Sequence, residues 1–207
     1  MTKTKHNFYV TPTLIDSFLW FERFGRPQDK FEELINKINK VPIEFPESAK
    51  KGVAFEDCVN LTISGQEIYK KDSFIFDSHL VNKVANKLKN NIGTQVWIEK
   101  TVPFEFGSVR VGGFVDYDYS DKIIDLKTTA NYKLGKYKEY QQHRAYGLIK
   151  PEKKEFIYFV TDFDNTYIEP YINKKSNHDE FLYNTGLFWE FTQENINLIT
   201  DKKIFGN

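Results

Sequence analysis

Two acidic residues in neighbouring segments of the chain, Asp116 and Asp125, have a residue type and spacing suited to metal binding. The segments that carry them, 111–119 and 122–128, are rich in valine, isoleucine and tyrosine, which predicts two strands. A hairpin between them places the two carboxylates opposite each other, with Cβ atoms about 5 Å apart. Like charges in that relation are destabilising unless a cation compensates them, and oxygen ligands favour Mg²⁺ or Mn²⁺. The alternative is an exposed hairpin whose acids face water.

Lys127 follows the second acid by two residues, so strand alternation puts both side chains on one face. Beside a bound ion, a lysine can orient a water molecule or stabilise developing negative charge. This prediction depends on a register in which Tyr117 pairs with Ile124. A slip of one residue would move every side chain to the other face of the sheet.

Glu56 is a third candidate acid, in a helix predicted from Glu47 to about Tyr69. Helical spacing puts it on an apolar stripe with Val53 and Val59. A carboxylate is costly to bury there unless it is paired or bound to a metal. The alternative is a boundary residue whose carboxylate reaches water.

A basic stretch follows the acidic hairpin. Eight basic and two acidic residues lie between positions 127 and 154, although the whole chain carries 29 of each sign. Such a stretch can face phosphates, with Lys133, Lys136 and Arg144 as the candidates, or it can be a plain solvated helix. Gln142 and Tyr146 are four residues apart at helical spacing, so they share a face and can contact phosphate or backbone groups.

The composition limits the class of protein. With 207 residues, 40% of them hydrophobic and 28% charged, the chain can form one globular domain with a buried core. The single cysteine, Cys58, excludes an intramolecular disulfide, a cysteine zinc site and an iron–sulfur cluster. No phosphate-binding glycine loop is present, so no nucleotide is expected. Without a spanning apolar run or the apolar region of a signal peptide, we expect a cytoplasmic protein with no membrane partner.

Periodicity predicts the elements that position these residues. We expect helices from about Thr11 to Gly25 and over 31–38, 47–69, 80–88, 137–149 and 181–199. We expect strands over 95–106, 108–119, 122–128, 154–161 and 166–172. This order predicts an α/β (α+β) fold in one domain over residues 1–207, with a mixed central sheet flanked by helices and a helical N-terminal part.

Three short motifs, taken together, resemble the PD-(D/E)XK nuclease superfamily, in particular its RecB-type or phage-type exonuclease branch. They are Gly-x-x-Asp ending at Asp116, Asp-x-Lys starting at Asp125 and Gln-x-x-x-Tyr starting at Gln142, in this order along the chain. The segment from Thr11 to Trp20 is similar to the N-terminal helix of that branch. The resemblance covers about residues 10–160 and implies a restriction-endonuclease-like core.

The resemblance implies a nuclease that uses Mg²⁺ or Mn²⁺ to hydrolyse phosphodiester bonds. Its metal ligands would be Asp116, Asp125 and Glu56, joined by the backbone carbonyl of Leu126. Lys127 would contact the attacking water or the scissile phosphate. Many RecB-type members have histidine at the position of Glu56, which is a departure from their pattern.

Within this class, an exonuclease acting on DNA ends is favoured, and Gln142 and Tyr146 would support its site and the DNA backbone. A structure-specific or single-strand endonuclease of the same fold is one alternative, and a catalytically inactive nucleic-acid-binding or assembly module is another. DNA is the expected partner, and the resemblance also allows a recombination or single-strand-annealing protein and an oligomer. The cleavage polarity, the strand preference and the choice between DNA and RNA stay open.

Overall fold

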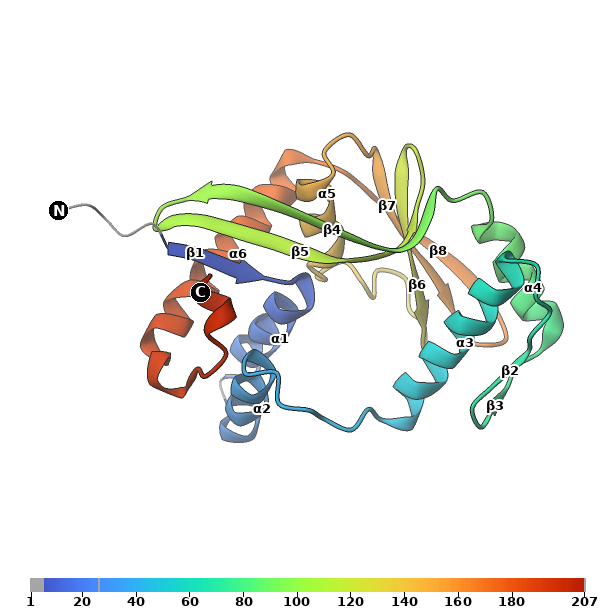
Figure 1. Ribbon diagram of the computed structural model, residues 1–207, viewed down its shortest axis with the longest axis horizontal. Helices are drawn as coiled ribbons and strands as arrows, with labels where there is room; N and C mark the ends of the chain where they lie inside the picture. Colours follow the sequence, from blue (N-terminus) through green and yellow to red (C-terminus); the bar gives the residue numbers. More distant parts are fainter. Residues whose placement is uncertain (1–5, 26, 207) are drawn as a thin grey trace.

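The computed structural model describes residues 6–25 and 27–206, which form a mixed sheet with helices packed against it (Figure 1). The α-helices are α1 (Pro12–Arg23), α2 (Gln28–Ile38), α3 (Glu47–Ile63), α4 (Ser78–Leu88), α5 (Gln142–Ile149) and α6 (Lys175–Glu194), and none of them is long and apolar enough to cross a membrane. The sheet consists of β1 (His6–Val10), β4 (Gly93–Phe104), β5 (Gly107–Asp118), β6 (Lys122–Thr128), β7 (Glu155–Thr161) and β8 (Thr166–Ile172). A small hairpin, β2 (Lys70–Lys71) and β3 (Phe74–Ile75), and two short 3-10 helices, Ile196–Leu198 and Lys202–Phe205, lie outside it. The predicted α/β (α+β) class, a mixed central sheet flanked by helices, is confirmed.

Strand β5 is the centre of the sheet because it pairs with three other strands. Its partner on one edge is β4, which runs antiparallel along its whole length. On its other edge, β1 pairs in parallel with residues 107–111, whereas β6 pairs antiparallel with only Tyr117 and Asp118. Strands β7 and β8 then extend the sheet beyond β6. Among the described residues, this edge of β5 therefore has no strand partner between residues 112 and 116.

Two hydrophobic clusters hold the helices against the sheet. The larger cluster joins β1, β4 and β5 to α1, α5 and α6, and includes Phe8, Phe18, Val111, Tyr146 and Phe188. The second joins β6 and β7 to α3 and α4, and includes Phe55, Val84, Tyr117, Leu126 and Phe159. Each helix buries an apolar stripe, as amphipathic helices do. Helices α3 and α5 therefore belong to different clusters. Helix α5 reaches the unpaired part of β5 through Tyr146, and α3 reaches the end of β5 through Asn60, which accepts the hydroxyl of Tyr117.

Helix α3 is shorter than its sequence predicts. The periodicity suggested a helix to about Tyr69, but the helix ends at Ile63. Gly65 adopts a φ of +90°, and the N–H of Gln66 bonds back to the carbonyl of Leu61. A glycine in this conformation ends helices because it has no Cβ to clash.

Other elements also differ from the prediction. Helix α5 begins at Gln142 rather than near residue 137, because residues 134–139 form turns around Gly135, whose φ is +80°. Helix α6 begins at Lys175, earlier than predicted, and ends at Glu194. The predicted helix continued to residue 199, but Ile196–Leu198 form a short 3-10 helix instead. Strand β1 was not predicted, because its pairing with β5 joins residues about 100 positions apart.

Candidate functional site

The candidate site lies where β5 and β6 separate. Tyr117 pairs with Ile124, which confirms the predicted register. Asp116 does not continue this ladder; its Oδ2 accepts the backbone N–H of Leu126 at 2.9 Å. The carboxylate therefore occupies the point at which the two strands diverge, and it satisfies a backbone donor that a neighbouring strand would otherwise take.

Helix α5 closes the other side of this opening. The hydroxyl of Tyr146 donates to the carbonyl of Phe114 at 2.8 Å, on the part of β5 that lacks a strand partner. A Cβ at Gly113 would lie 2.5 Å from that hydroxyl oxygen, so glycine is needed for α5 to approach so closely. The glycine of the Gly-x-x-Asp motif thus has a packing role in positioning the helix.

Helix α3 brings Glu56 to the same place. It crosses the end of β6 at Gly52, where a Cβ would lie 2.5 Å from the hydroxyl oxygen of Thr128. Glu56 follows one turn later, and its Oε1 accepts the side-chain amide of Gln95 at 2.5 Å. The same amide donates to Oδ1 of Asp116 at 3.2 Å. The two carboxylates are therefore linked through a single amide group.

Gln95 is a site residue that the sequence did not point to. It lies on β4 opposite Asp116, between the register pairs Thr94–Tyr117 and Val96–Val115, and it has a φ of +50°. Non-glycine residues rarely adopt this conformation, and in proteins it is concentrated at functional sites. Nothing in the local sequence distinguishes this glutamine, because its role depends on its partners in space.

Asp125 is the most buried acid of the site, with 2% of its surface exposed. Its Oδ1 accepts the side-chain amide of Gln142 at 2.9 Å, and its Oδ2 lies 2.7 Å from the ammonium of Lys127. Apart from that ion pair, Oδ2 has no hydrogen-bond partner. Gln142 thus contacts Asp125 and orients one of its carboxylate oxygens, while the other oxygen faces the lysine.

The acids of the site perturb one another strongly. Burial, followed by the charge of Asp125, raises the pKa of Glu56 to about 7. Burial and the charges of Asp125 and Glu56 hold the pKa of Asp116 well above its ordinary value. Burial alone would lower the pKa of Lys127, but Asp125 and Asp116 outweigh it, so that pKa is raised. Three acids thus share one lysine, and the site lacks positive charge.

A fourth acid, Asp16, approaches from α1. Its Oδ1 accepts the N–H of Gln141 at 2.9 Å, just before α5 begins. Burial raises its pKa to about 6, although the nearby charge of Lys127 opposes the shift. Asp16 lies within the segment that resembles the exonuclease N-terminal helix, but neither its burial nor its contact with α5 could be predicted from the sequence.

The basic candidates are dispersed in the structure. Lys133 and Lys136 are exposed in the loop between β6 and α5, where the ammonium of Lys136 donates to the carbonyl of Asn131 at 3.1 Å. Arg144 is a correction to the predicted phosphate-facing set, because only 5% of it is exposed and its guanidinium pairs with Glu180 at 3.0 Å. Its charge is used to join α5 to α6.

The site fits a hard divalent cation in its chemistry but is not arranged as a complete ligand cage. In residues 6–25 and 27–206, no three His, Cys, Asp or Glu side chains are grouped closely enough to hold a metal ion as they stand. The amide of Gln95 lies between Glu56 and Asp116 instead. The donor set is nevertheless entirely oxygen, and among the described residues the only ammonium next to the buried Asp125 carboxylate is that of Lys127, so a cation would supply positive charge that the three acids lack. The residues that could hold it are Glu56, Asp116 and Asp125, with the carbonyl of Leu126.

Comparisons with known proteins establish the fold but no family. No protein-family model matches the chain. The solved structure described as "Crystal structure of SSO0001" superposes with a TM-score of 0.54 at 11% identity, covering 89% of this chain and 77% of that chain. A curated sorting nexin-4 from Candida glabrata is 30% identical over 112 residues, which are 54% of this chain and 23% of the nexin. The chain therefore spans less than a quarter of that relative, and the structural likeness concerns the fold alone.

Proposed function

We propose that this chain is a Mg²⁺- or Mn²⁺-dependent nuclease that hydrolyses phosphodiester bonds at DNA ends. The observation that carries the proposal is the gathering of Glu56, Asp116, Asp125 and Lys127 where β5 and β6 separate. These four residues come from three different elements. A structural ion pair would need one acid and one base, whereas this site brings three acids, the buried Asp125 and the half-buried Glu56 and Asp116, around one lysine.

Each side chain has a task that follows from its position. Glu56, Asp116 and Asp125 would present their oxygens to the cation, and Gln142 fixes the orientation of the Asp125 carboxylate. When bound, the cation would hold the scissile phosphate and lower the pKa of the attacking water. Lys127, held by Asp125, would contact the phosphate and stabilise the negative charge that develops on it.

Digestion of end-labelled DNA tests this proposal. Linear and circular single-stranded DNA are incubated with Mg²⁺, with Mn²⁺ or with a chelator. An exonuclease degrades the linear substrate in either metal, leaves the circle whole and stops in the chelator. Cleavage of the circle would assign the chain to endonucleases, and equal cleavage in the chelator would refute a metal-dependent reaction.

Variants of the site residues make the test specific. Asp125→Ala and Lys127→Ala are expected to lower the cleavage rate by roughly 10²- to 10³-fold or more. Lys122→Ala is the matched control on the same strand, because this lysine lies over the ring of Tyr119 and outside the acidic cluster. Undiminished cleavage by both site variants would refute the assignment.

A catalytically inactive nucleic-acid-binding module is the second candidate. It is favoured by the amide of Gln95, which lies between two of the carboxylates. Calorimetric titration with Mn²⁺ separates the two functions. A nuclease binds the ion and loses binding in Asp125→Ala, whereas an inactive module gives no metal-dependent heat.

A further inference from the structure

The uncovered face of the β4–β5 hairpin carries a pair of aromatic side chains. Trp97 on β4 and Phe114 on β5 are directly opposite in the register, and their ring centroids are 4.9 Å apart. They are 42% and 54% exposed, respectively. Large apolar side chains exposed in contact with each other indicate a binding surface more strongly than the same residues scattered singly.

This pair adjoins the candidate site. Gln95 precedes Trp97 by two residues on β4, and Asp116 follows Phe114 by two residues on β5, so the site begins where the aromatic pair ends along both strands. The rings are therefore the next layer of side chains beyond the carboxylates. A ligand lying on them can extend directly into the opening between β5 and β6.

A glycine on the far side of the pair makes room for the indole of Trp97. Gly112 precedes Phe114 by two residues on β5, and a Cβ there would lie 2.8 Å from Cζ2 of Trp97. The indole can lean over the strand only because Gly112 has no side chain. The indole N–H donates to Glu99 at 3.1 Å, which holds the ring in this position.

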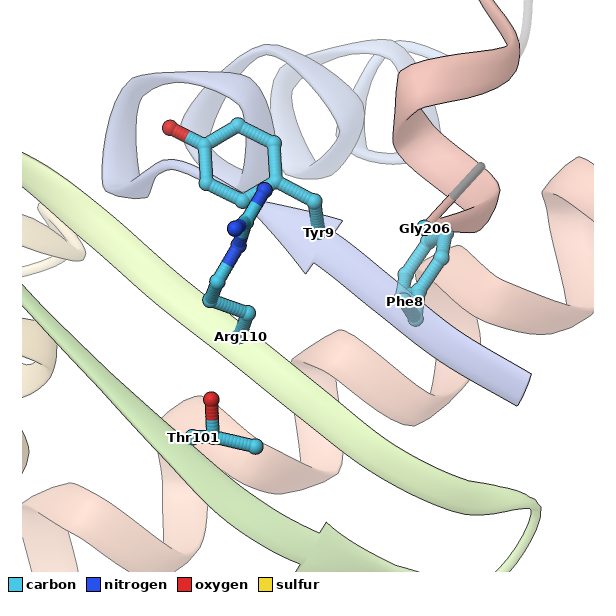
Figure 2. Close-up of a pocket in the computed structure, with 5 residues that line it drawn as sticks. All are labelled: Phe8, Tyr9, Thr101, Arg110 and Gly206. Atoms are coloured by element: carbon cyan, nitrogen blue, oxygen red, sulfur yellow. The ribbon is translucent and has the colours of Figure 1, made fainter. Parts of the chain in front are cut away.

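The same face continues to an arginine at its far end. Arg110 lies on β5 with its guanidinium 5.0 Å from the centroid of the Tyr9 ring on β1. Figure 2 shows these two side chains against each other, with Thr101 of β4 beside them. They border a shallow hollow of about 220 Å³ that is also lined by Phe8 and Gly206. The face thus extends from the guanidinium of Arg110, over the rings of Trp97 and Phe114, to the acids of the candidate site.

The opposite side of the hairpin is already filled. Val109, Val111 and Val115 alternate with the exposed residues of β5 and are buried in the cluster formed with α1, α5 and α6. Helices α3 and α4 pack further along the sheet, in the cluster that contains Tyr117. The exposure of Trp97 and Phe114 shows that no described element covers their face.

We propose that this face binds an unpaired nucleic-acid strand, with bases stacked on Trp97 and Phe114 and a phosphate or base near Arg110. This inference rests on the proposed function and names its substrate as single-stranded. Exposed aromatic rings interspersed with arginine bind single strands, because every unpaired base offers a flat face. A duplex hides those faces within its own stack, so it gains nothing from the two rings.

A nucleic-acid strand fits this surface better than a second copy of the chain does. The aromatic pair is small and is flanked by charged residues on the same strands, Glu99 and Arg110, both of which are exposed. The core of a subunit interface is depleted in charged residues. Continuity with the carboxylates gives the face a reason to bind the same molecule as the site does.

Binding in the absence of cleavage tests the proposal. A fluorescent deoxythymidine strand of about 15 nucleotides and a hairpin duplex are titrated with the full chain in chelator, and anisotropy is recorded. The single strand is expected to bind more tightly than the duplex. Trp97→Ala and Phe114→Ala are each expected to weaken its binding by roughly 10-fold, whereas Trp97→Phe, which keeps a stacking ring, retains most of the affinity.

Tyr183→Ala is the matched control, since Tyr183 is 67% exposed on α6, on the other side of the hairpin. Unchanged binding by both aromatic variants, or an equal loss in Tyr183→Ala, would overturn the proposal. A change from dimer to monomer in Phe114→Ala, seen by light scattering, would assign the face to a second copy instead. Circular dichroism of each variant confirms that a loss of binding is not a loss of fold.

The outcome separates this inference from the proposed function. If the wild-type chain cleaves DNA with Mg²⁺ but the aromatic variants bind normally, the nuclease assignment stands and the stacking surface is refuted. If no divalent ion supports cleavage but the aromatic variants bind more weakly, the stacking surface stands and the nuclease assignment is refuted.

Discussion

At the scale of single residues, the site is organised by a shortage of positive charge. Glu56 and Asp116 share the amide of Gln95, and Asp125 uses Lys127 and Gln142. Buried acids are tolerated only when donors or cations satisfy them. Gln95 supplies two such contacts from a backbone conformation, φ +50°, that itself costs of the order of 1 kcal/mol for a residue with a side chain.

Removing that amide should destabilise the metal-free chain. Gln95→Ala leaves two neighbouring carboxylates without their shared donor, so we expect the free energy of unfolding in chelator to fall by about 1.5–3 kcal/mol. Millimolar Mg²⁺ should recover part of this loss. Urea unfolding measures both effects, and Gln66→Ala, a change at an exposed loop glutamine, is the control. Equal unfolding midpoints for wild type and Gln95→Ala in chelator would contradict this role.

His143 is a buried titratable residue behind the site. Its ring stacks on that of Tyr171, with centroids 4.1 Å apart, and burial and the neighbouring Arg144 lower its pKa to about 3. Between about pH 6.5 and pH 3, His143 is therefore protonated in the unfolded chain but neutral in the folded chain. The free energy of unfolding falls as the pH falls through this range.

The effect of His143 can be isolated by substitution. When the pH is lowered from 7.5 to 5, His143 should lower the free energy of unfolding by about 2 kcal/mol, since each pKa unit is worth about 1.4 kcal/mol. His143→Phe keeps a ring for stacking but cannot titrate. Its free energy of unfolding should therefore fall less than that of wild type between the two pH values, by about this amount. Urea unfolding at the two pH values measures the difference. Parallel pH dependences in the two proteins would show that the histidine does not titrate in this way.

At the scale of elements, two glycines set how closely helices approach the acids. Gly113 admits Tyr146 of α5, and Gly52 lets α3 cross the end of β6 against Thr128. The position of Glu56 depends on the second contact, because it lies one turn further along α3. The sequence shows both glycines, but it does not show what each one touches.

The contact between α3 and β6 predicts a change of sign in a double-mutant cycle. Gly52→Ala alone should destabilise the chain by about 1–3 kcal/mol, since its Cβ would meet the hydroxyl of Thr128. Thr128→Ala removes that oxygen, and the next atoms lie 3.8 Å or more away in the unsubstituted chain. In that background Gly52→Ala should be neutral or stabilising by up to about 1 kcal/mol, because alanine favours helix. The same cost in both backgrounds, measured by urea unfolding, would show that Thr128 is not the obstacle.

At the scale of the whole molecule, features that depend on local sequence patterns could be predicted, whereas features that depend on contacts between distant residues could not. The register of β5 and β6 follows from a short turn and from alternation around Tyr117 and Ile124, both of which are local. Arg144 shows the limit, because its charge is matched by Glu180, a residue 36 positions away that no local pattern connects to it. Strand β1 and the role of Gln95 were not predicted for the same reason, since both depend on distant partners on β5.

The two hydrophobic clusters meet at the site. We therefore expect a cation that binds there to raise the free energy of unfolding of the whole molecule. Glu56 belongs to the α3 side, whereas Gln142 and Tyr146 reach the opening from α5. In the metal-free chain, repulsion among the three carboxylates opposes this assembly. A cation that binds only the folded chain would stabilise it by mass action.

Glu56→Gln tests this coupling because it removes one charge and keeps the shape of the side chain. At pH 8 in chelator, we expect this variant to be about 1–3 kcal/mol more stable than wild type, since a buried like charge is gone. Added Mg²⁺ should raise the unfolding midpoint of wild type but have less effect on the variant. Asp57→Asn is the control, because Asp57 is a half-exposed acid next to Glu56 on α3 that pairs with Lys71. Equal Mg²⁺ responses in wild type and Glu56→Gln would mean that Glu56 takes no part in holding a cation.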